Sequence, residues 1–168
     1  MSRKSEKELQ PPSSEGQLTE RAPRYGALPP GTRAASLGPP GYSATLACEA
    51  ASARQARLLV RGALRIWGLD GLTAPATLVV SELVANSVEH TRSHAIRVTV
   101  SRPWPALVRV AVTDTSRIVP ELREADDEDE EGRGLAVIDT ISARWGYDRL
   151  PWGKRTWAEL RMPVGEKE

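Results

Sequence analysis

The stretch SELVANSVEHT, residues 81–91, carries side chains that could do chemistry at intervals of four. They are the carboxylate of Glu82, the amide of Asn86 and the imidazole of His90. In a helix, which turns by about 100° per residue, these three groups lie in one narrow stripe. A face that only meets solvent more usually carries Lys, Glu and Arg, so the stripe is chemically selective. The nearby apolar residues lie on a different arc: Val80, Leu83, Val84 and Val88.

A second set of candidates flanks a long polar loop. Asp114 ends an apolar stretch, VTDTS, and the loop closes at Gly132-Arg133-Gly134, which opens a helical pattern. Long loops inside a compact domain are usually lids, binding loops or disordered segments. Glycines and free amides at a helix start favour phosphate, although two glycines there also suit a plain turn. Asp114 fits either an ordinary turn residue or a buried acceptor for an amino group, such as the exocyclic amine of adenine.

Two further features have simpler interpretations. The acidic run from Asp126 to Glu131 is typical of a solvated loop tip. Close to phosphates it would repel them unless Mg²⁺ intervenes or the tip points away. His90 and His94 have metal-like spacing, but the sequence supplies no third ligand, so we expect His90 to pack or hydrogen-bond at a helix end.

Composition limits the class of protein. The chain has 168 residues and a net charge of +1, so no global charge points to nucleic acid or an anionic membrane. We expect no membrane span and no signal peptide. The single cysteine, Cys48, excludes an internal disulfide, and with two histidines it makes a structural zinc site improbable. A cytoplasmic location is the expectation.

Periodicity predicts the elements that must position these groups. Residues 1–41 are rich in Pro, Gly, Ser and charge and predict a disordered tail, followed by a domain at 42–164 and a C-terminal tail at 165–168. Thr73 is a candidate cap and Pro75 lies in the first turn of the second helix. Helices are predicted at 52–69, 71–91 and 133–145, and strands at 42–50, 95–101, 107–114, 145–150 and 156–163.

This order of elements predicts the fold class. Short turns between neighbouring strands imply mostly antiparallel pairing, and the helices can cover only one face. We therefore expect an α/β two-layer sandwich with a mixed, mostly antiparallel sheet.

Taken together and in this order, the motifs resemble a known superfamily. They are Glu82-x-x-x-Asn86-x-x-x-His90, then Asp114-x-Ser116, then Gly132-Arg133-Gly134-Leu135. The set is similar to the GHKL superfamily of ATPases, which includes gyrase, histidine kinases and heat-shock chaperones. The short layout and the closing GKRTWAEL look like the branch of bacterial anti-sigma-factor serine/threonine kinases. The resemblance spans roughly residues 42–164.

The resemblance implies a role for each residue of the opening helix and the strand end. In that family the motif asparagine, here Asn86, coordinates a Mg²⁺ that bridges the phosphates of ATP, and an amide oxygen suits this hard cation. The motif glutamate, here Glu82, would be the general base for phosphoryl transfer. The strand-end aspartate, here Asp114, would accept the adenine amine.

The resemblance also implies an ATP lid and a threonine contact. Gly132 and Gly134, followed by Leu135, would wrap the phosphates with backbone amides, and Arg133 would help neutralise their charge. Thr156 matches a family threonine near the adenine. The sequence departs from the family at Ser116, where glycine is common and a side chain would crowd the purine, and in the acidic lid.

Three functions compete. The first is an ATP-dependent serine/threonine kinase that binds a sigma factor and phosphorylates an anti-anti-sigma antagonist, as a possible homodimer without direct contact to nucleic acid or membrane. The second is an ATP-binding anti-sigma or signalling module without kinase activity. The third, a histidine kinase catalytic domain, is disfavoured because no histidine precedes His90. Glu82 favours the kinase, since a pure binding module has no chemical need for a base.

Overall fold

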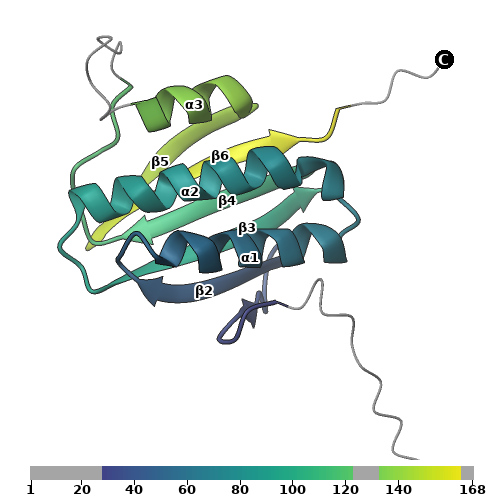
Figure 1. Cartoon of the computed structure of the whole chain (residues 1–168), viewed down its shortest axis with the longest axis horizontal. Helices are drawn as coiled ribbons and strands as arrows, with labels where there is room; N and C mark the ends of the chain where they lie inside the picture. Colours follow the sequence, from purple (N-terminus) through teal and green to yellow (C-terminus); the bar gives the residue numbers. More distant parts are fainter. Residues whose placement is uncertain (1–27, 123–132, 164–168) are drawn as a thin grey trace, which may run out of the picture.

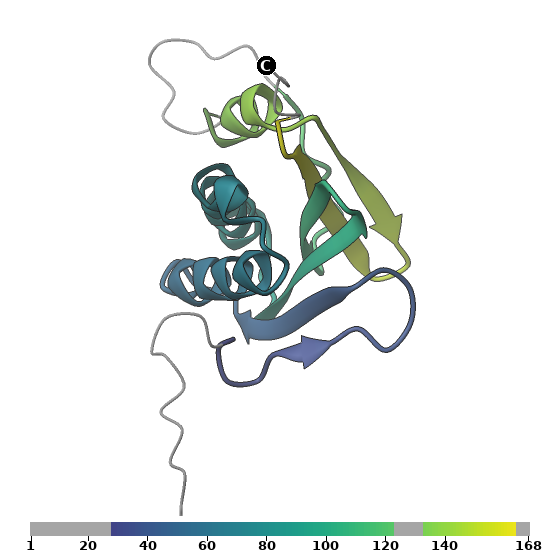
Figure 2. The ribbon, with the colours of Figure 1, turned by 90° about the vertical axis from the view of Figure 1, so that its right-hand side faces the viewer.

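The computed structural model describes residues 28–122 and 133–163. They form two layers, a sheet and a set of helices on one of its faces (Figures 1 and 2). The strands are β1 (Arg33–Ala34), β2 (Gly41–Ala47), β3 (Ala95–Trp104), β4 (Leu107–Asp114), β5 (Arg144–Leu150) and β6 (Gly153–Arg161). The helices are α1 (Ser52–Ile66), the short 3₁₀ turn η1 (Asp70–Leu72), α2 (Thr73–His90) and α3 (Arg133–Ile141). The predicted α/β two-layer sandwich is confirmed.

The sheet has the strand order β1-β2-β3-β4-β6-β5, and every pairing between the described strands is antiparallel. After β4 the chain passes through α3, re-enters the sheet as the edge strand β5, and turns back as β6 between β5 and β4. This return sets the end of β4 against the start of β6, with Asp114 paired to Lys154 in register. Two residues that are far apart in the sequence thereby meet where β4 ends, on the helix-covered face of the sheet.

The core lies between the sheet and the helices. Along β4, Val108, Val110 and Val112 are fully buried, as the period of two requires for strand residues that face a helix layer. Leu59 and Val60 of α1 meet them from the other layer as part of one apolar cluster. The sheet therefore gives α2 a rigid base on which its polar stripe can be held.

Helix α2 is the central helix of the layer, between α1 and α3 (Figure 1). By length and composition alone, the segment Asp70–His90 is apolar enough to cross a membrane. Its apolar residues, among them Val80, Leu83 and Val84, are instead buried in the domain core. That burial explains the composition, because a helix packed on three sides must be apolar over most of its surface.

The folded part extends further toward the N-terminus than the predicted start at Tyr42. Arg33 and Ala34 of β1 pair with Ser43 and Tyr42 of β2, and Leu28 packs against the core. Gly62 allows this packing, since a Cβ there would come within 2.8 Å of the Leu28 side chain. Residues 1–27 and 164–168, which include the rest of the predicted tails, lie outside the described part of the chain.

The helix ends differ slightly from those predicted. Thr73 does not cap α2: it is the first helical residue, and its carbonyl oxygen accepts a hydrogen bond from Thr77 Oγ1 at 2.7 Å. Pro75 does lie in the first turn, where its missing N–H costs nothing. Helix α3 ends at Ile141 rather than 145, because the Ala143 amide already donates to the Glu159 carbonyl oxygen of the sheet at 2.8 Å.

The helix-free face of the sheet carries a compact charged cluster. Glu159 of β6 is 3% exposed although it lies on this face. Its carboxylate accepts hydrogen bonds from Arg109, at 2.9 Å from Nε, and from Arg144. Both guanidinium groups also lie over the Trp157 ring. The Arg144 hydrogen bond, followed by Arg109, lowers the pKa of Glu159 despite its burial.

The lowered pKa of Glu159 predicts an acid-sensitive contribution to stability. A carboxyl whose pKa is lower in the folded state stabilises the fold above its unfolded pKa, and this contribution is lost as the pH falls through the folded pKa. We expect Glu159→Gln to reduce the free energy of unfolding at pH 7 by about 1.5–3 kcal/mol. Urea titrations from pH 7 to pH 3 should show the gap to the wild-type protein closing at low pH. A constant gap would contradict the assignment.

Candidate functional site

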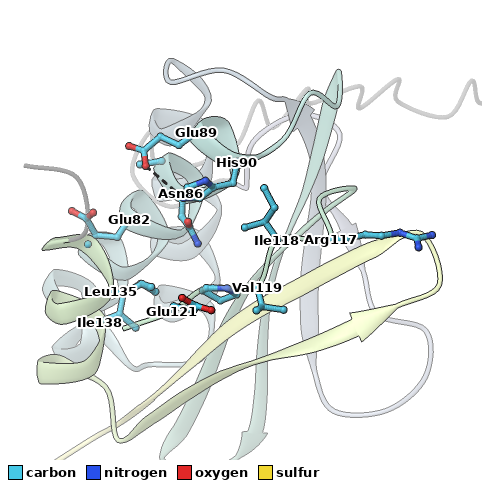
Figure 3. A pocket seen from close by; sticks show the side chains of 13 residues that line it. Glu82, Asn86, Glu89, His90, Arg117, Ile118, Val119, Glu121, Leu135 and Ile138 are labelled. Atoms are coloured by element: carbon cyan, nitrogen blue, oxygen red, sulfur yellow. Dashed lines mark ion pairs between the residues drawn. The ribbon is translucent and has the colours of Figure 1, made fainter. Parts of the chain in front are cut away.

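A cavity of about 530 Å³ opens between α2, the segment that follows β4, and the start of α3 (Figure 3). Polar residues of α2 form one wall, and apolar residues of α3 and of the segment after β4 form much of the rest. The lining residues are Glu82, Ala85, Asn86, Glu89, His90, Arg117, Ile118, Val119, Pro120, Glu121, Gly134, Leu135 and Ile138.

The structure brings the predicted stripe of α2 together on this wall. Glu82, Asn86 and His90 all line the cavity, because residues four apart share a helix face while the apolar arc packs on the core. His90 is the last residue of α2 and its side chain is partly exposed, with Nε2 4.0 Å from a carboxylate oxygen of Glu89. Sequence reasoning missed Glu89, which adds a second carboxylate to the same wall.

Gly134 lies directly against the Glu82 carboxylate. A Cβ at position 134 would stand 2.5 Å from Glu82 Oε2, so a larger residue there would displace the end of the Glu82 side chain. Leu135 and Ile138 continue the wall along α3, whereas Arg133 begins that helix with an exposed side chain. Gly132 and the acidic run, residues 126–131, lie outside the described residues.

The charge of the cavity wall is mostly negative. Glu82, Glu89 and Glu121 contribute carboxylates, and Arg117 contributes a guanidinium that points away from α2 (Figure 3). Carboxylates at this density would repel a bare polyphosphate. A divalent cation between the wall and the phosphates would remove that repulsion.

The oxygen atoms of the side chains on this wall are suitable ligands for Mg²⁺. Carboxylate and amide oxygens are hard ligands, and Mg²⁺ usually takes one or two of them and completes its shell with water and phosphate oxygens. Within the described residues no three His, Cys, Asp or Glu side chains converge as a full protein cage. Asn86, with Glu82 one turn away, therefore suits a cation that a phosphate ligand brings with it.

Asp114 is a buried acceptor at the end of β4, away from the cavity lining. It is 1% exposed, it does not line the cavity, and its carboxylate is already hydrogen-bonded. Ser87 Oγ donates to Oδ2 at 2.7 Å, the Ser116 amide donates to Oδ1 at 2.8 Å, and Lys154 Nζ lies 3.2 Å from both oxygens. Sequence reasoning missed Lys154. Alternation of side chains along β6 predicts that Lys154 faces the helices, but its partner depends on the register between β6 and β4.

The turn between β5 and β6 fixes this ion pair. A Cβ on Gly153 would stand 2.0 Å from the Asp114 carbonyl oxygen and 2.8 Å from Thr115 Cα, so the turn packs directly on the end of β4. Nearby, burial and then the negative charge of Asp114 raise the pKa of the Cys48 thiol. The thiol therefore stays protonated at neutral pH and is a poor nucleophile.

Ser116 and Thr156 also lie outside the cavity lining. Ser116 is a buried residue of the segment after β4, and its hydroxyl accepts a hydrogen bond from the Ile118 amide at 3.1 Å. Thr156 lies on the inner face of β6, and its buried hydroxyl has no hydrogen-bond partner among the described residues. A buried hydroxyl without a hydrogen-bond partner is costly.

Comparison with known families agrees with this geometry. Residues 46–162 match the histidine kinase-like ATPase domain, a span that takes in α2, the cavity and β6. No curated protein sequence matches the chain. Because the match covers well over half of the chain, this protein belongs to the histidine kinase-like ATPase domain family.

Proposed function

We propose that the cavity between α2 and α3 binds ATP with Mg²⁺. The observation that carries the proposal is the wall of α2, where Glu82 and Asn86 face the cavity one turn apart beside the start of α3. Asn86 would hold Mg²⁺ through its amide oxygen, and the free amides at the N-terminus of α3 would favour the phosphates. Bound Mg²⁺ supplies charge neutralisation on the triphosphate.

We propose further that Glu82 makes the domain a serine/threonine kinase. Its carboxylate would accept the proton of an attacking protein hydroxyl as that oxygen bonds to the γ-phosphorus and the bond to the β-phosphate oxygen breaks. The products are a phosphorylated hydroxyl and ADP. The nearness of Gly134 to Glu82 supports this role, because it places the carboxylate beside the first turn of α3. Leu135 and Ile138 add apolar surface that limits water beside the base.

The proposed biological role is anti-sigma regulation in the cytoplasm. The single-domain layout and the closing GKRTWAEL resemble the kinases that sequester a sigma factor and phosphorylate an anti-anti-sigma antagonist. A homodimer of the chain is part of this proposal. The proposal of these partners is based on the resemblance. The family match supports the ATPase domain that the proposal requires.

Substitution of the metal ligand tests the binding half of the proposal. Asn86→Ala is expected to weaken ATP binding in Mg²⁺ by at least tenfold and to leave the weak binding in EDTA unchanged. Calorimetric titrations at several Mg²⁺ concentrations measure both quantities. Ser81→Ala, on the same helix but outside the cavity lining, is the matched control. An unchanged Mg²⁺ dependence in Asn86→Ala would place the metal ligand elsewhere.

A further inference from the structure

The helix-free face of the sheet carries more arginines than carboxylates. All the described helices lie on the other side of the sheet (Figure 2). Residues that pair directly across antiparallel strands share a face, so the strand register defines three neighbouring rows here. They are Arg33, Ser43, Thr99, Ala111, Trp157 and Gly146; Thr45, Arg97, Thr113, Arg155 and Asp148; and Gly41, Ser101, Arg109, Glu159 and Arg144. The rows hold five arginines and two carboxylates.

Two of these arginines have no counter-charge. Both carboxylates of the rows, Glu159 and Asp148, already accept hydrogen bonds from arginines of the same rows. Among the described residues, no carboxylate pairs with Arg33 or Arg97. Arg97 Nη2 donates a long hydrogen bond of 3.4 Å to Ser43 Oγ. This end of the face therefore has positive charge that its own side chains do not neutralise.

A cavity of about 310 Å³ lies between these two arginines. Arg33 belongs to β1 and Arg97 to β3, so they flank the two hydroxyl residues of β2 between them. The lining is formed by Gly31, Arg33, Ser43, Ala44, Thr45 and Arg97, without an acidic residue. Guanidinium groups bind carboxylates through paired N–H donors, and hydroxyls can donate to the same oxygens. The cavity is therefore suited to the carboxylate of an Asp or Glu side chain.

The layout of the remaining face favours a polypeptide over a single small anion. The backbones of Arg97 and Arg155 are two strands apart in one row, about 10 Å at the usual strand spacing. Arg155 also pairs with Asp148 of β5, on its far side from Arg97. The residues between the two arginine-bearing ends are no larger than threonine: Ser43, Thr99, Ser101, Ala111 and Thr113. An acidic segment can lie on this low floor and contact both ends.

Two observations favour an acidic protein segment over nucleic acid. Proteins that bind single strands stack bases on exposed aromatic rings, but on this face the guanidinium groups of Arg109 and Arg144 lie over the Trp157 ring. The whole chain carries a net charge of only +1, so it lacks the general positive field that attracts a phosphate backbone. Binding must therefore come from local pairs between arginines and carboxylates.

We propose that the helix-free face of the sheet is a docking surface for an acidic segment of a partner protein. The cavity between Arg33 and Arg97 receives one carboxylate of that segment, and the small residues of the floor let its backbone lie close to the sheet. This inference is independent of the nucleotide site, which lies on the opposite face between α2 and α3. The two proposals can therefore fail separately.

A labelled peptide tests the inference on the unaltered full-length chain. Octaglutamate carrying fluorescein is titrated with protein at low salt, and binding is followed by fluorescence anisotropy, with octaglutamine as the neutral control. The double substitution Arg33→Gln and Arg97→Gln is expected to weaken octaglutamate binding by at least tenfold, because it removes both guanidinium groups of the cavity. Circular dichroism confirms that the variant is folded. No binding of octaglutamate by the unaltered protein would overturn the inference.

A matched pair of substitutions separates this face from other basic surfaces. Arg61 and Arg65 are exposed on α1, in the opposite layer, so Arg61→Gln with Arg65→Gln removes the same charge elsewhere. We expect this control to change octaglutamate binding by less than about threefold. An equal or larger loss in the control would overturn the inference. An octathymidylate that binds this face more tightly than octaglutamate would overturn it in favour of nucleic acid. A dimer abolished by the Arg33 and Arg97 substitutions in sedimentation velocity would assign the face to a second copy instead.

Discussion

Glu82→Gln is expected to lower phosphoryl transfer to a protein hydroxyl by about 10²- to 10⁴-fold, the usual contribution of a positioned general base. Glutamine keeps the shape of the side chain and its contact with Gly134 but cannot take a proton. ATP affinity should stay within about threefold, because Asn86 remains to hold Mg²⁺. The assay follows transfer from labelled ATP to purified anti-anti-sigma antagonist proteins, tested one at a time.

The matched control for this experiment is Glu89→Gln. Glu89 carries the same group on the same cavity wall, but it lies against His90 rather than against the start of α3. We expect its loss to change transfer by less than about fivefold. Equal transfer by Glu82→Gln and the unaltered protein would rule out Glu82 as the base. Absence of transfer by the unaltered protein, with ATP binding intact, would favour the ATP-binding module without kinase activity.

Asp114→Ala is expected to reduce the free energy of unfolding by about 3–5 kcal/mol, the usual cost of breaking a buried ion pair by removal of one partner. The substitution leaves the Lys154 ammonium buried without its counter-charge and leaves Ser87 and the Ser116 amide without their acceptor. Lys154 is itself 1% exposed, so its ammonium loses the counter-charge without access to solvent in the folded structure. Urea-induced unfolding followed by circular dichroism measures the loss.

A surface ion pair between β5 and β6 provides the comparison. Asp148 accepts hydrogen bonds from Arg155 at 2.7 and 3.0 Å, but both side chains are close to half exposed. Asp148→Ala should therefore cost about 0–1 kcal/mol. Similar losses in the two variants would show that the Asp114–Lys154 pair does not anchor the fold as described.

The features predicted well from the sequence are those that depend on local periodicity. The stripe of Glu82, Asn86 and His90 follows from a helix of 3.6 residues per turn, and the buried valines of β4 follow from alternation along a strand. Both patterns are properties of a single continuous segment. The layers of the fold follow from the order of such segments.

The features that were missed depend on pairing between distant segments. The salt bridge from Lys154 to Asp114 requires the register of β4 with β6, which the Gly153 turn and the return of the chain through α3 determine. Strand β1 has two residues, too few for any period, and only its pairing with β2 reveals it. The role that the resemblance implies for Asp114 toward the adenine amine therefore stays a prediction.

Titration of ATP into the full-length protein by calorimetry, in excess Mg²⁺ and again in EDTA, tests the proposed nucleotide site. We expect one site per chain in Mg²⁺ and binding at least tenfold weaker in EDTA, since the carboxylates of the cavity wall repel uncompensated phosphates. Equal affinity in both conditions, or no binding by a protein shown to be folded, would contradict it.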